Sequence, residues 1–318
     1  MHTPKIFGGR WIVGAVLAIL ATFLFRTPYT ASLVNLIAIA ALTAASMRFV
    51  MLIGEVSFAT AAFMAVGAYG AGVATTIFQW PFIVAMLIGP VIVALVSFPF
   101  GLVTLRAKGP YFMLISFAFA EAVRIGLSKA DVVGGVSGMA GIFPPRWLDH
   151  WLPTFVVAVV LLLLFVLYVV EKSDFGKVLV AIRDNEDIVS TVGLNVLMSK
   201  VACFVLASLC AGVAGSLQAF VNNVISPGDF SFLLAAYGLA YVKIGGESSL
   251  FGSVVGAIVL VLLSSFALGL GAGEHFVYGG AIVLAMLLMP KGLVGVSWKR
   301  WLPASRKRTG KRTKIVTF

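Results

Sequence analysis

Charged residues are scarce in this sequence. Only 11% of its 318 residues are charged, whereas 61% are hydrophobic, and the mean hydropathy is +1.08. Soluble domains carry about 25% charged residues and about 45–50% apolar ones. Uncharged runs such as 82–105 and 152–170 approach the roughly 20 residues that cross a bilayer as a helix. The composition therefore excludes a water-soluble protein and predicts a chain embedded in lipid.

Groups for catalysis and metal binding are also few. Cys203 and Cys210 lie on one predicted helix, separated by roughly 10 Å, which is too far for a disulfide. The three histidines are scattered, and no cluster of potential ligands has metal-binding spacing. The Gly-Lys pairs at 176–177 and 310–311 are followed by Val and Arg, so neither belongs to a Walker A motif. We therefore expect that this chain has no metal site, binds no cofactor, does not hydrolyse ATP and is not an enzyme.

The hydrophobic runs predict an all-α bundle of membrane helices. They are continuous, whereas an outer-membrane barrel would alternate apolar and polar residues. We expect about ten spans (8 to 10), some of them broken or re-entrant. The predicted spans are 11–25, 32–53, 58–78, 82–105, 111–127, 152–170, 201–221, 232–250, 252–271 and 276–290. The first run also resembles the start of a signal peptide, but no small-residue cleavage site follows it, which favours a retained span.

The net charge of +11 is concentrated in the C-terminal tail. Nine of the 23 basic residues follow Pro290, and the remaining charges nearly balance. Basic residues beside membrane spans stay cytoplasmic and attract anionic lipid, so we expect membrane lipid as a partner and no nucleic acid. This distribution predicts a cytoplasmic N-terminus (1–10), a transmembrane permease domain (11–290) with a cytoplasmic loop at 171–200, and a basic cytoplasmic tail (291–318).

Charges at membrane depth are costly and mark candidate functional sites. Glu121 and Arg124 are three residues apart, and Lys243 and Glu247 are four apart, so each couple is predicted to form an ion pair on one helix. Each pair is interpreted either as self-neutralising charge near a helix end or as part of a solute path. Arg48 and Glu55 also carry charge at membrane depth, without a local partner.

Two segments, 54–78 and 238–256, are rich in glycine and other small residues. Such segments pack closely or break a membrane helix where it lines a cavity. The free backbone groups of a break at 54–57 could hydrogen-bond a polar solute. We therefore expect broken or re-entrant helices in these two segments.

The longest polar loop contains a predicted amphipathic helix. Within 175–192, Val178, Leu179, Ile182, Val189 and Val192 recur near the helical period, and Gly193 is a suitable stop. This apolar stripe needs a surface to cover it. It could lie against its own bundle or the lipid interface, but the surrounding charges favour docking to a cytoplasmic partner.

Several motifs in order resemble one family, the permeases of branched-chain amino acid ABC importers, in the subtype with Arg-x-x-Gly-Pro-Tyr-Phe. The similarity runs from about residue 50 to 295. The matching stretches are Gly54-Glu-Val-Ser57 with Phe63 and Gly67-Ala-Tyr69, Arg106-Ala-Lys-Gly-Pro-Tyr-Phe112 through Glu121, Gly134-Gly-Val-Ser-Gly138, Ser173-Asp-Phe-Gly176, Ala181-Ile-Arg-Asp-Asn-Glu186 with Gly193 and Lys200, Ser226-Pro227, Gly245-Gly246 with Gly252, and Pro290-Lys-Gly-Leu-Val-Gly295.

The resemblance implies a multi-pass subunit of the bacterial inner membrane that works with a homologous second permease, two cytoplasmic ATP-binding subunits and a periplasmic solute-binding protein. ATP would be used by those partner subunits. The implied contacts to the ATPase are Ala181, Ile182, Arg183, Asn185, Glu186 and Gly193. The residues expected along the translocation path are Gly54, Glu55, Ser57, Thr60, Phe63, Gly67, Gly109, Tyr111, Gly245 and Gly246.

Departures from the family pattern leave the substrate open. Glu55 stands where Gln is common, Thr60 where His is usual, and Ile188 where a small alanine is usual. Branched-chain amino acids or a related small polar solute are expected. The alternatives are a permease for urea or short amides, a self-sufficient secondary transporter or channel, and, least favoured because no nucleophile or metal set is present, a membrane-embedded enzyme.

Overall fold

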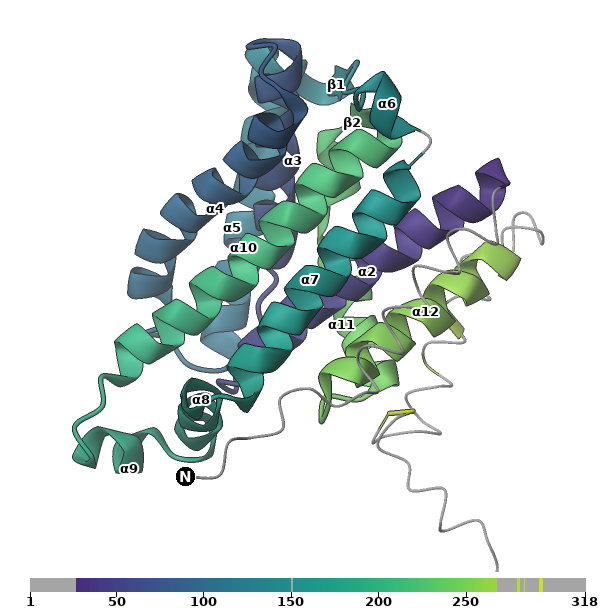
Figure 1. Cartoon of the computed structure of the whole chain (residues 1–318). Coiled ribbons are helices and arrows are strands. Elements are labelled where there is room, and N and C mark those ends of the chain that lie inside the picture. Colours follow the sequence, from purple (N-terminus) through teal and green to yellow (C-terminus); the bar gives the residue numbers. More distant parts are fainter. Residues whose placement is uncertain (1–26, 150, 268–278, 281–282, 284–291, 294–318) are drawn as a thin grey trace, which may run out of the picture.

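The computed structural model describes residues 27–149, 151–267, 279–280, 283 and 292–293. The predicted first span, the predicted N-terminal segment, nearly all of the predicted last span and nearly all of the tail therefore lie outside the described residues. Within these ranges the chain forms a bundle of long helices with short elements at both ends (Figure 1).

The long helices match the predicted spans to within a few residues at most ends. They are α2 (Pro28–Met51), α3 (Thr60–Thr76), α4 (Phe82–Thr104), α5 (Pro110–Lys129), α7 (Leu152–Lys172), α10 (Val196–Asn222), α11 (Phe232–Gly245) and α12 (Leu250–Ala267). In the described part, five helices are long and apolar enough to cross a membrane, or up to six if the bent pair α11–α12 counts as one span. The all-α membrane bundle is confirmed, and a total of about ten spans stays a prediction.

Short elements gather at the two ends of the bundle. At one end lie η1 (Asp131–Val133), η2 (Gly135–Ser137), β1 (Met139–Ala140), α6 (Arg146–Asp149), β2 (Val224–Ile225) and η3 (Pro227–Phe230). Strands β1 and β2 pair antiparallel, with Met139 opposite Ile225. We call this the β end. At the other end lie α8 (Asp174–Asp184), α9 (Glu186–Thr191) and the links 52–59, 105–109 and 246–249. We call it the α8 end.

The centre of the bundle is held by close contacts between glycines. A Cβ added at Gly67 of α3 would lie 2.2 Å from the carbonyl oxygen of Gly212 on α10, and one added at Gly70 would lie 2.9 Å from the Cα of Gly89 on α4. At Gly215, an added Cβ would lie 2.0 Å from the carbonyl oxygen of Met64. Small residues let helix backbones approach where lipid provides no hydrophobic drive. Helices α3, α4 and α10 therefore meet backbone to backbone.

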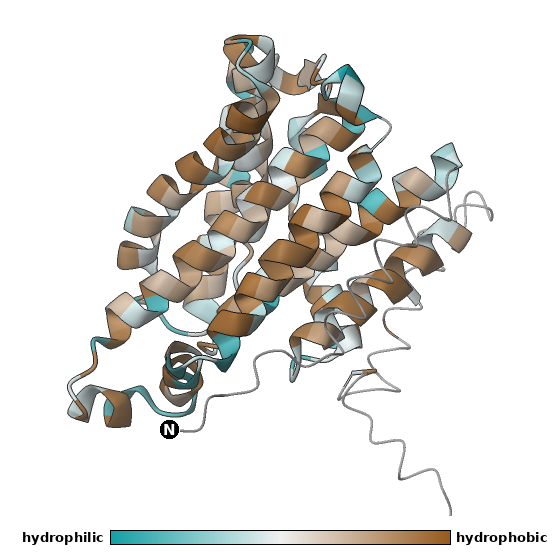
Figure 2. Ribbon diagram, viewed as in Figure 1, coloured by the Kyte–Doolittle hydropathy of each residue, from teal (hydrophilic) through white to brown (hydrophobic). Residues whose placement is uncertain are grey.

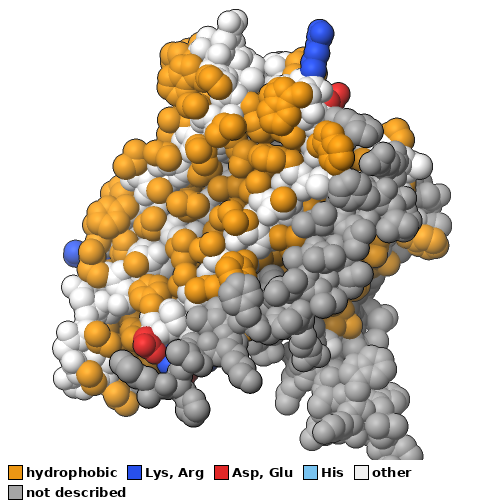
Figure 3. All heavy atoms as spheres, in the orientation of Figure 1, with side chains coloured by type: hydrophobic (Ala, Val, Ile, Leu, Met, Phe, Trp, Pro, Cys, Tyr) orange, Lys and Arg blue, Asp and Glu red, His pale blue; other side chains and the backbone are white. Residues whose placement is uncertain are grey.

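The described exterior of the bundle carries many large apolar side chains. Figure 2 shows hydrophobic residues along α4, α7 and α10. In Figure 3, hydrophobic side chains are spread over the described part of the visible face, whereas charged ones are few and lie near its edges. Leu95 and Val103 of α4 and Leu162 of α7 are 70%, 72% and 63% exposed. An apolar exterior of this extent is suited to lipid rather than water.

Cys203 and Cys210 are free and buried.

Both glycine-rich segments contain the expected breaks. The chain between α2 and α3 is not helical and turns at Gly54, whose φ is +83°. Helices α11 and α12 are bent by 114° around a short break that starts at Gly246, where φ is +110°. A positive φ is accessible to glycine at little cost. Both breaks lie at the α8 end (Figure 1).

Candidate functional site

The predicted amphipathic helix over 175–192 is in fact two helices. Asn185 adopts an extended conformation, with φ −163° and ψ 107°, between α8 and α9. Its side-chain oxygen accepts hydrogen bonds from the N–H groups of Asp187 (3.0 Å) and Ile188 (3.3 Å). An Asn side chain caps a helix start better than it continues a helix. The prediction of one continuous helix was wrong because this local cap outweighs the apolar period.

The apolar stripe of this segment is only partly covered by the bundle. Leu179, Ile182 and Val189 are 0%, 1% and 6% exposed, so most of the stripe packs against the protein itself. Val192 of the stripe, by contrast, is 74% exposed, and so is the neighbouring Ile188, at 63%. We call these two side chains the α9 patch. The α9 patch lies at the α8 end, and the described part of the chain does not cover its two aliphatic side chains.

The residues expected to contact an ATPase fall into two groups. Ala181, Arg183, Asn185 and Gly193 are exposed, and Gly193 has a φ of +84° with open space around it. Ile182 is buried, and Glu186 is partly buried and turned toward its own chain.

Glu186 connects α9 to two other parts of the bundle. Its carboxylate forms an ion pair with Lys200 of α10, which is 2% exposed, and accepts a second ion pair from Lys108 at 2.9 Å. Burial by itself would raise the pKa of Glu186, but hydrogen bonds from Lys108 and Lys200 outweigh burial and hold that pKa below its usual 4.5. Glu186 is therefore a charged internal tether between α9, α10 and the link after α4.

The predicted residues Glu55 and Gly109 are brought together in space. An oxygen of the Glu55 carboxylate accepts a hydrogen bond of 3.0 Å from the Gly109 N–H, although the two are far apart in sequence. Burial raises the pKa of Glu55 above its usual 4.5, while the Gly109 N–H and nearby Lys200 act in the opposite direction. Next to Glu55, an added Cβ on Gly54 would lie 3.0 Å from Cγ of Arg183. The link 52–59 thus touches α8 and the link 105–109.

A second buried ion pair was missed by sequence reasoning. Arg48 of α2, which is 2% exposed, donates two hydrogen bonds to the Glu171 carboxylate, at 2.7 and 3.0 Å. Its Nε also donates to the carbonyl oxygen of Glu247, at 2.9 Å. Arg48 therefore joins α2, α7 and the break between α11 and α12. The partners lie 123 and 199 residues away in sequence, so no local spacing could reveal them.

Both predicted ion pairs are present. Arg124 lies 2.7 Å from Glu121 on α5, and Lys243 pairs with Glu247 across the end of α11. All four side chains are between 25% and 46% exposed. Each pair neutralises its own two charges within one short segment. A role for these pairs in a solute path stays a prediction.

Most residues expected along the path are buried. Phe63 belongs to an aromatic cluster in which its ring centroid lies 5.6 Å from that of Phe204. Ser57 and Thr60 are buried in and beside the link 52–59, and an added Cβ on Gly245 would lie 1.8 Å from the carbonyl oxygen of Gly252. Tyr111, in contrast, is 74% exposed on the first turn of α5. The path assigned to these residues remains a prediction.

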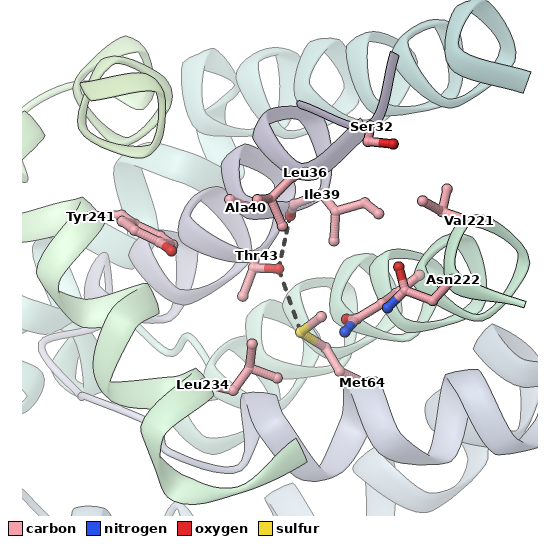
Figure 4. Close-up of a pocket in the computed structure, with 11 residues that line it drawn as sticks. Ser32, Leu36, Ile39, Ala40, Thr43, Met64, Val221, Asn222, Leu234 and Tyr241 are labelled. Carbon is pink, nitrogen blue, oxygen red and sulfur yellow. Dashed lines mark hydrogen bonds between the residues drawn. The ribbon is translucent and has the colours of Figure 1, made fainter. Parts of the chain in front are cut away.

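A cavity of about 290 Å3 lies elsewhere, between α2, α3, α10 and α11. Figure 4 shows Thr43 near its centre, with Tyr241 and Leu234 on one side and Asn222 on the other. The Thr43 hydroxyl donates to the Ile39 carbonyl oxygen at 2.9 Å and lies 3.4 Å from the sulfur of Met64. No sequence motif marks this cavity, because its lining comes from four helices.

Long apolar helices with an exposed hydrophobic exterior, interrupted at two places, define a multi-pass α-helical membrane protein. Residues 29–289 match the family model described as the permease component of branched-chain amino acid transport systems. The chain belongs to this family, which confirms the family resemblance, and the subtype with Arg-x-x-Gly-Pro-Tyr-Phe stays a prediction.

Individual relatives are distant. The chain is 27% identical, over 73% of its length, to the high-affinity branched-chain amino acid transport system permease protein LivM of Escherichia coli, and it spans 62% of that protein. It is 24% identical to a probable LivM permease of Methanocaldococcus jannaschii, covering 67% of this chain and 68% of the relative. It is also 29% identical, over 46% of its length, to a probable LivH permease of that organism, of which it spans 48%. No solved structure matched the chain.

Proposed function

We propose that this chain is the membrane-spanning permease subunit of an ABC importer and forms a translocation path for branched-chain amino acids or a related small polar solute. The observation that carries the proposal is the α9 patch, exposed at the tip of two short helices at one end of a membrane bundle. Exposed aliphatic groups on a short helix are suited to a groove in a partner. The family membership and the absence of a Walker A motif from the sequence support a partner that supplies ATP hydrolysis.

The partners in this proposal are a second homologous permease, two cytoplasmic ATP-binding subunits and a periplasmic solute-binding protein. The subunit lies in the bacterial inner membrane, with the α8 end and both termini in the cytoplasm. The sequence supports this orientation because the basic residues Arg106, Lys108, Arg183 and Lys200 all belong to segments at the α8 end.

Movement of the ATPase subunits would reach the bundle through contacts at the α8 end. Displacement of α9 pulls on Glu186, and its ion pairs transmit the displacement to Lys200 on α10 and to Lys108. Displacement of α8 moves Arg183, which lies against Gly54 in the break before α3. These connections allow a cytoplasmic event to rock membrane helices between two arrangements, as alternating access requires.

Docking is tested by comparing two exposed valines at opposite ends. Val192 is 74% exposed at the α8 end, and Val136 is 80% exposed at the β end. We expect Val192→Asp to abolish co-purification of the ATP-binding subunit because it places a charge in an apolar contact, whereas Val136→Asp retains it. Arg183→Ala should weaken the same association. Equal co-purification by both Asp variants would contradict the docking assignment.

The energy source is tested by reconstitution. In proteoliposomes, solute uptake should require the second permease, the ATP-binding subunits, the binding protein and ATP. Concentrative uptake by this chain without those subunits would instead establish a secondary transporter. Uptake of urea or acetamide in preference to leucine by the full complex would replace the proposed substrate class.

A further inference from the structure

Helix α5 combines two properties that a lipid-facing span does not share. Among the five long spans in the described part of the chain it is the least buried, with 17% of its most apolar stretch inside the protein, and it is also the least hydrophobic. Helix α7 is nearly as little buried, at 28%, but it is the most hydrophobic of the five. A span that faces lipid over most of its surface is expected to be strongly apolar, as α7 is. The outer face of α5 is therefore suited to protein rather than lipid.

The ion pair of Glu121 and Arg124 makes lipid a costly neighbour for α5. Glu121 lies ~17 Å along the helix from Pro110 and ~12 Å from Lys129, which is near the middle of the span. The side chains of Glu121 and Arg124 are 25% and 33% exposed. Charged side chains at this depth almost always face protein or a water-filled cavity. The part of the pair that the described chain leaves open therefore requires a neighbour other than lipid.

Small residues occupy the middle of the exposed face of α5. Ala118 and Ala122 are both exposed and lie one helical turn apart, between the larger exposed side chains of Leu114 and Ile125. On α4, by contrast, the middle of the exposed face carries large side chains such as Leu95. Lipid contact does not need small residues, whereas they let two membrane helices approach closely. The shape of this face therefore suits a second helix.

We propose that this face of α5 is the docking surface for the second permease subunit. The α5 face consists of the exposed residues of the helix middle with the ion pair at their edge, namely Leu114, Ala118, Ala122, Ile125, Glu121 and Arg124. The face runs along a membrane span, so its occupant must itself be embedded in the membrane. Among the proposed partner proteins, only the second permease meets this condition. The assignment rests on the proposed function and adds the surface through which the two permeases meet.

The charges of the α5 face also fit a homologous helix. Glu121 and Arg124 present both signs of charge about one turn apart. Related subunits around a twofold axis bring equivalent surfaces together, so that one residue of a pair meets the other residue of the partner's pair. An acid and a base on the second permease can then each meet the opposite charge. We therefore expect the helix that docks here to carry an acid and a base near its middle.

Two alanines give a matched test of this packing. Ala122 of α5 and Ala158 of α7 are both exposed, and they lie ~10 Å and ~9 Å along their helices from the β end. Ala122→Trp and Ala158→Trp would each be introduced into the full chain and co-expressed with a tagged second permease and the ATP-binding subunits. We expect Ala122→Trp to lower co-purification of the second permease at least about fivefold, the lower end of the effect of overpacking a close contact. Ala158→Trp should leave co-purification unchanged.

Two leucines give a matched test of proximity. Leu114 of α5 and Leu162 of α7 are 60% and 63% exposed, so a large photoreactive side chain can replace either one without crowding its own chain. A benzophenone amino acid would be placed at position 114 or at position 162 by nonsense suppression, and membranes that contain the assembled complex would be illuminated. The probe at position 114 should form a covalent adduct with the second permease, identified by its tag. The probe at position 162 should form none.

Equal co-purification by the two Trp variants, or equal yields of the permease adduct at the two probe positions, would overturn the α5 face as the docking surface. So would a probe at position 114 that reacts only with lipid, with an ATP-binding subunit or within its own chain. If Ala122→Trp does not fold, the photocrosslinking comparison decides alone. A second permease that co-purifies with the unmodified chain but does not cross-link at position 114 refutes only this surface. If no second permease co-purifies with the unmodified chain, the proposed function itself fails.

Discussion

Removing Arg48 should destabilise the bundle far more than removing an exposed lysine whose ion pair has the same N···O distance. Arg48→Met leaves the Glu171 carboxylate, 14% exposed, without its bidentate partner. Loss of one member of a buried pair typically costs about 3–5 kcal/mol. Because Glu171 retains some solvent contact, we expect the lower end, about 3 kcal/mol, which is on the order of a hundredfold change in the folding equilibrium.

The control is Lys177→Met. Lys177 and Asp174 also approach to 2.7 Å, but their side chains are 74% and 96% exposed, so we expect no measurable change in stability. The double variant Arg48→Met, Glu171→Leu removes both charges and should recover most of the loss, because replacing a buried pair by apolar side chains is often neutral.

The buried thiols of Cys203 and Cys210 provide the assay. On heating in detergent, a thiol-reactive fluorophore reports the temperature at which these side chains become accessible. Arg48→Met should give a markedly lower midpoint than Lys177→Met, and the double variant an intermediate or restored one. Equal midpoints for the two single variants, or a double variant no more stable than Arg48→Met, would refute the reasoning.

Three further predictions follow from described contacts. Gly67→Ala should abolish folded protein in the membrane, because its Cβ would lie 2.2 Å from the Gly212 oxygen. Gly126→Ala has nothing within 4 Å of its added Cβ and should stabilise the chain by about 0.5–1 kcal/mol. Expression yield and the midpoint of thermal unfolding measure both effects. Asn185→Ala removes the cap of α9, so a cost of about 1 kcal/mol should speed hydrogen exchange of the α9 amides roughly fivefold. The folded-state pKa of Glu186 lies below 4.5, so its stabilisation is present above pH 4.5 and is lost as pH falls through the folded-state pKa. Glu186→Gln should flatten that acid side of the unfolding profile, and an unchanged profile would contradict the tether.

Periodicity and composition predicted the features that depend on neighbouring residues. The long apolar runs gave the helices, the glycine-rich segments gave the breaks at Gly54 and Gly246, and three-residue spacing gave the pair Glu121 and Arg124. The ion pair could be predicted from spacing because a helix places residues three or four positions apart on the same face.

Features that depend on the packing of distant helices could not be predicted in this way. Arg48 meets Glu171 from 123 positions away, and the cavity combines side chains from four helices. The break at Asn185 was missed for a different reason. The apolar spacing continues across it, so the period alone favours one helix, and only the ability of Asn to cap a helix start indicates two.

The glycine contacts among α3, α4 and α10 also determine which parts of the bundle can move. A side chain at an interface can change rotamer and let two helices slide, but at Gly67 with Gly212 and at Gly70 with Gly89 the nearest atoms belong to the backbone of the neighbouring helix. Sliding these helices would force backbone atoms past one another. We therefore expect these three helices to move as one rigid body, and any conformational change to occur at their interfaces with α7, α11 and α12.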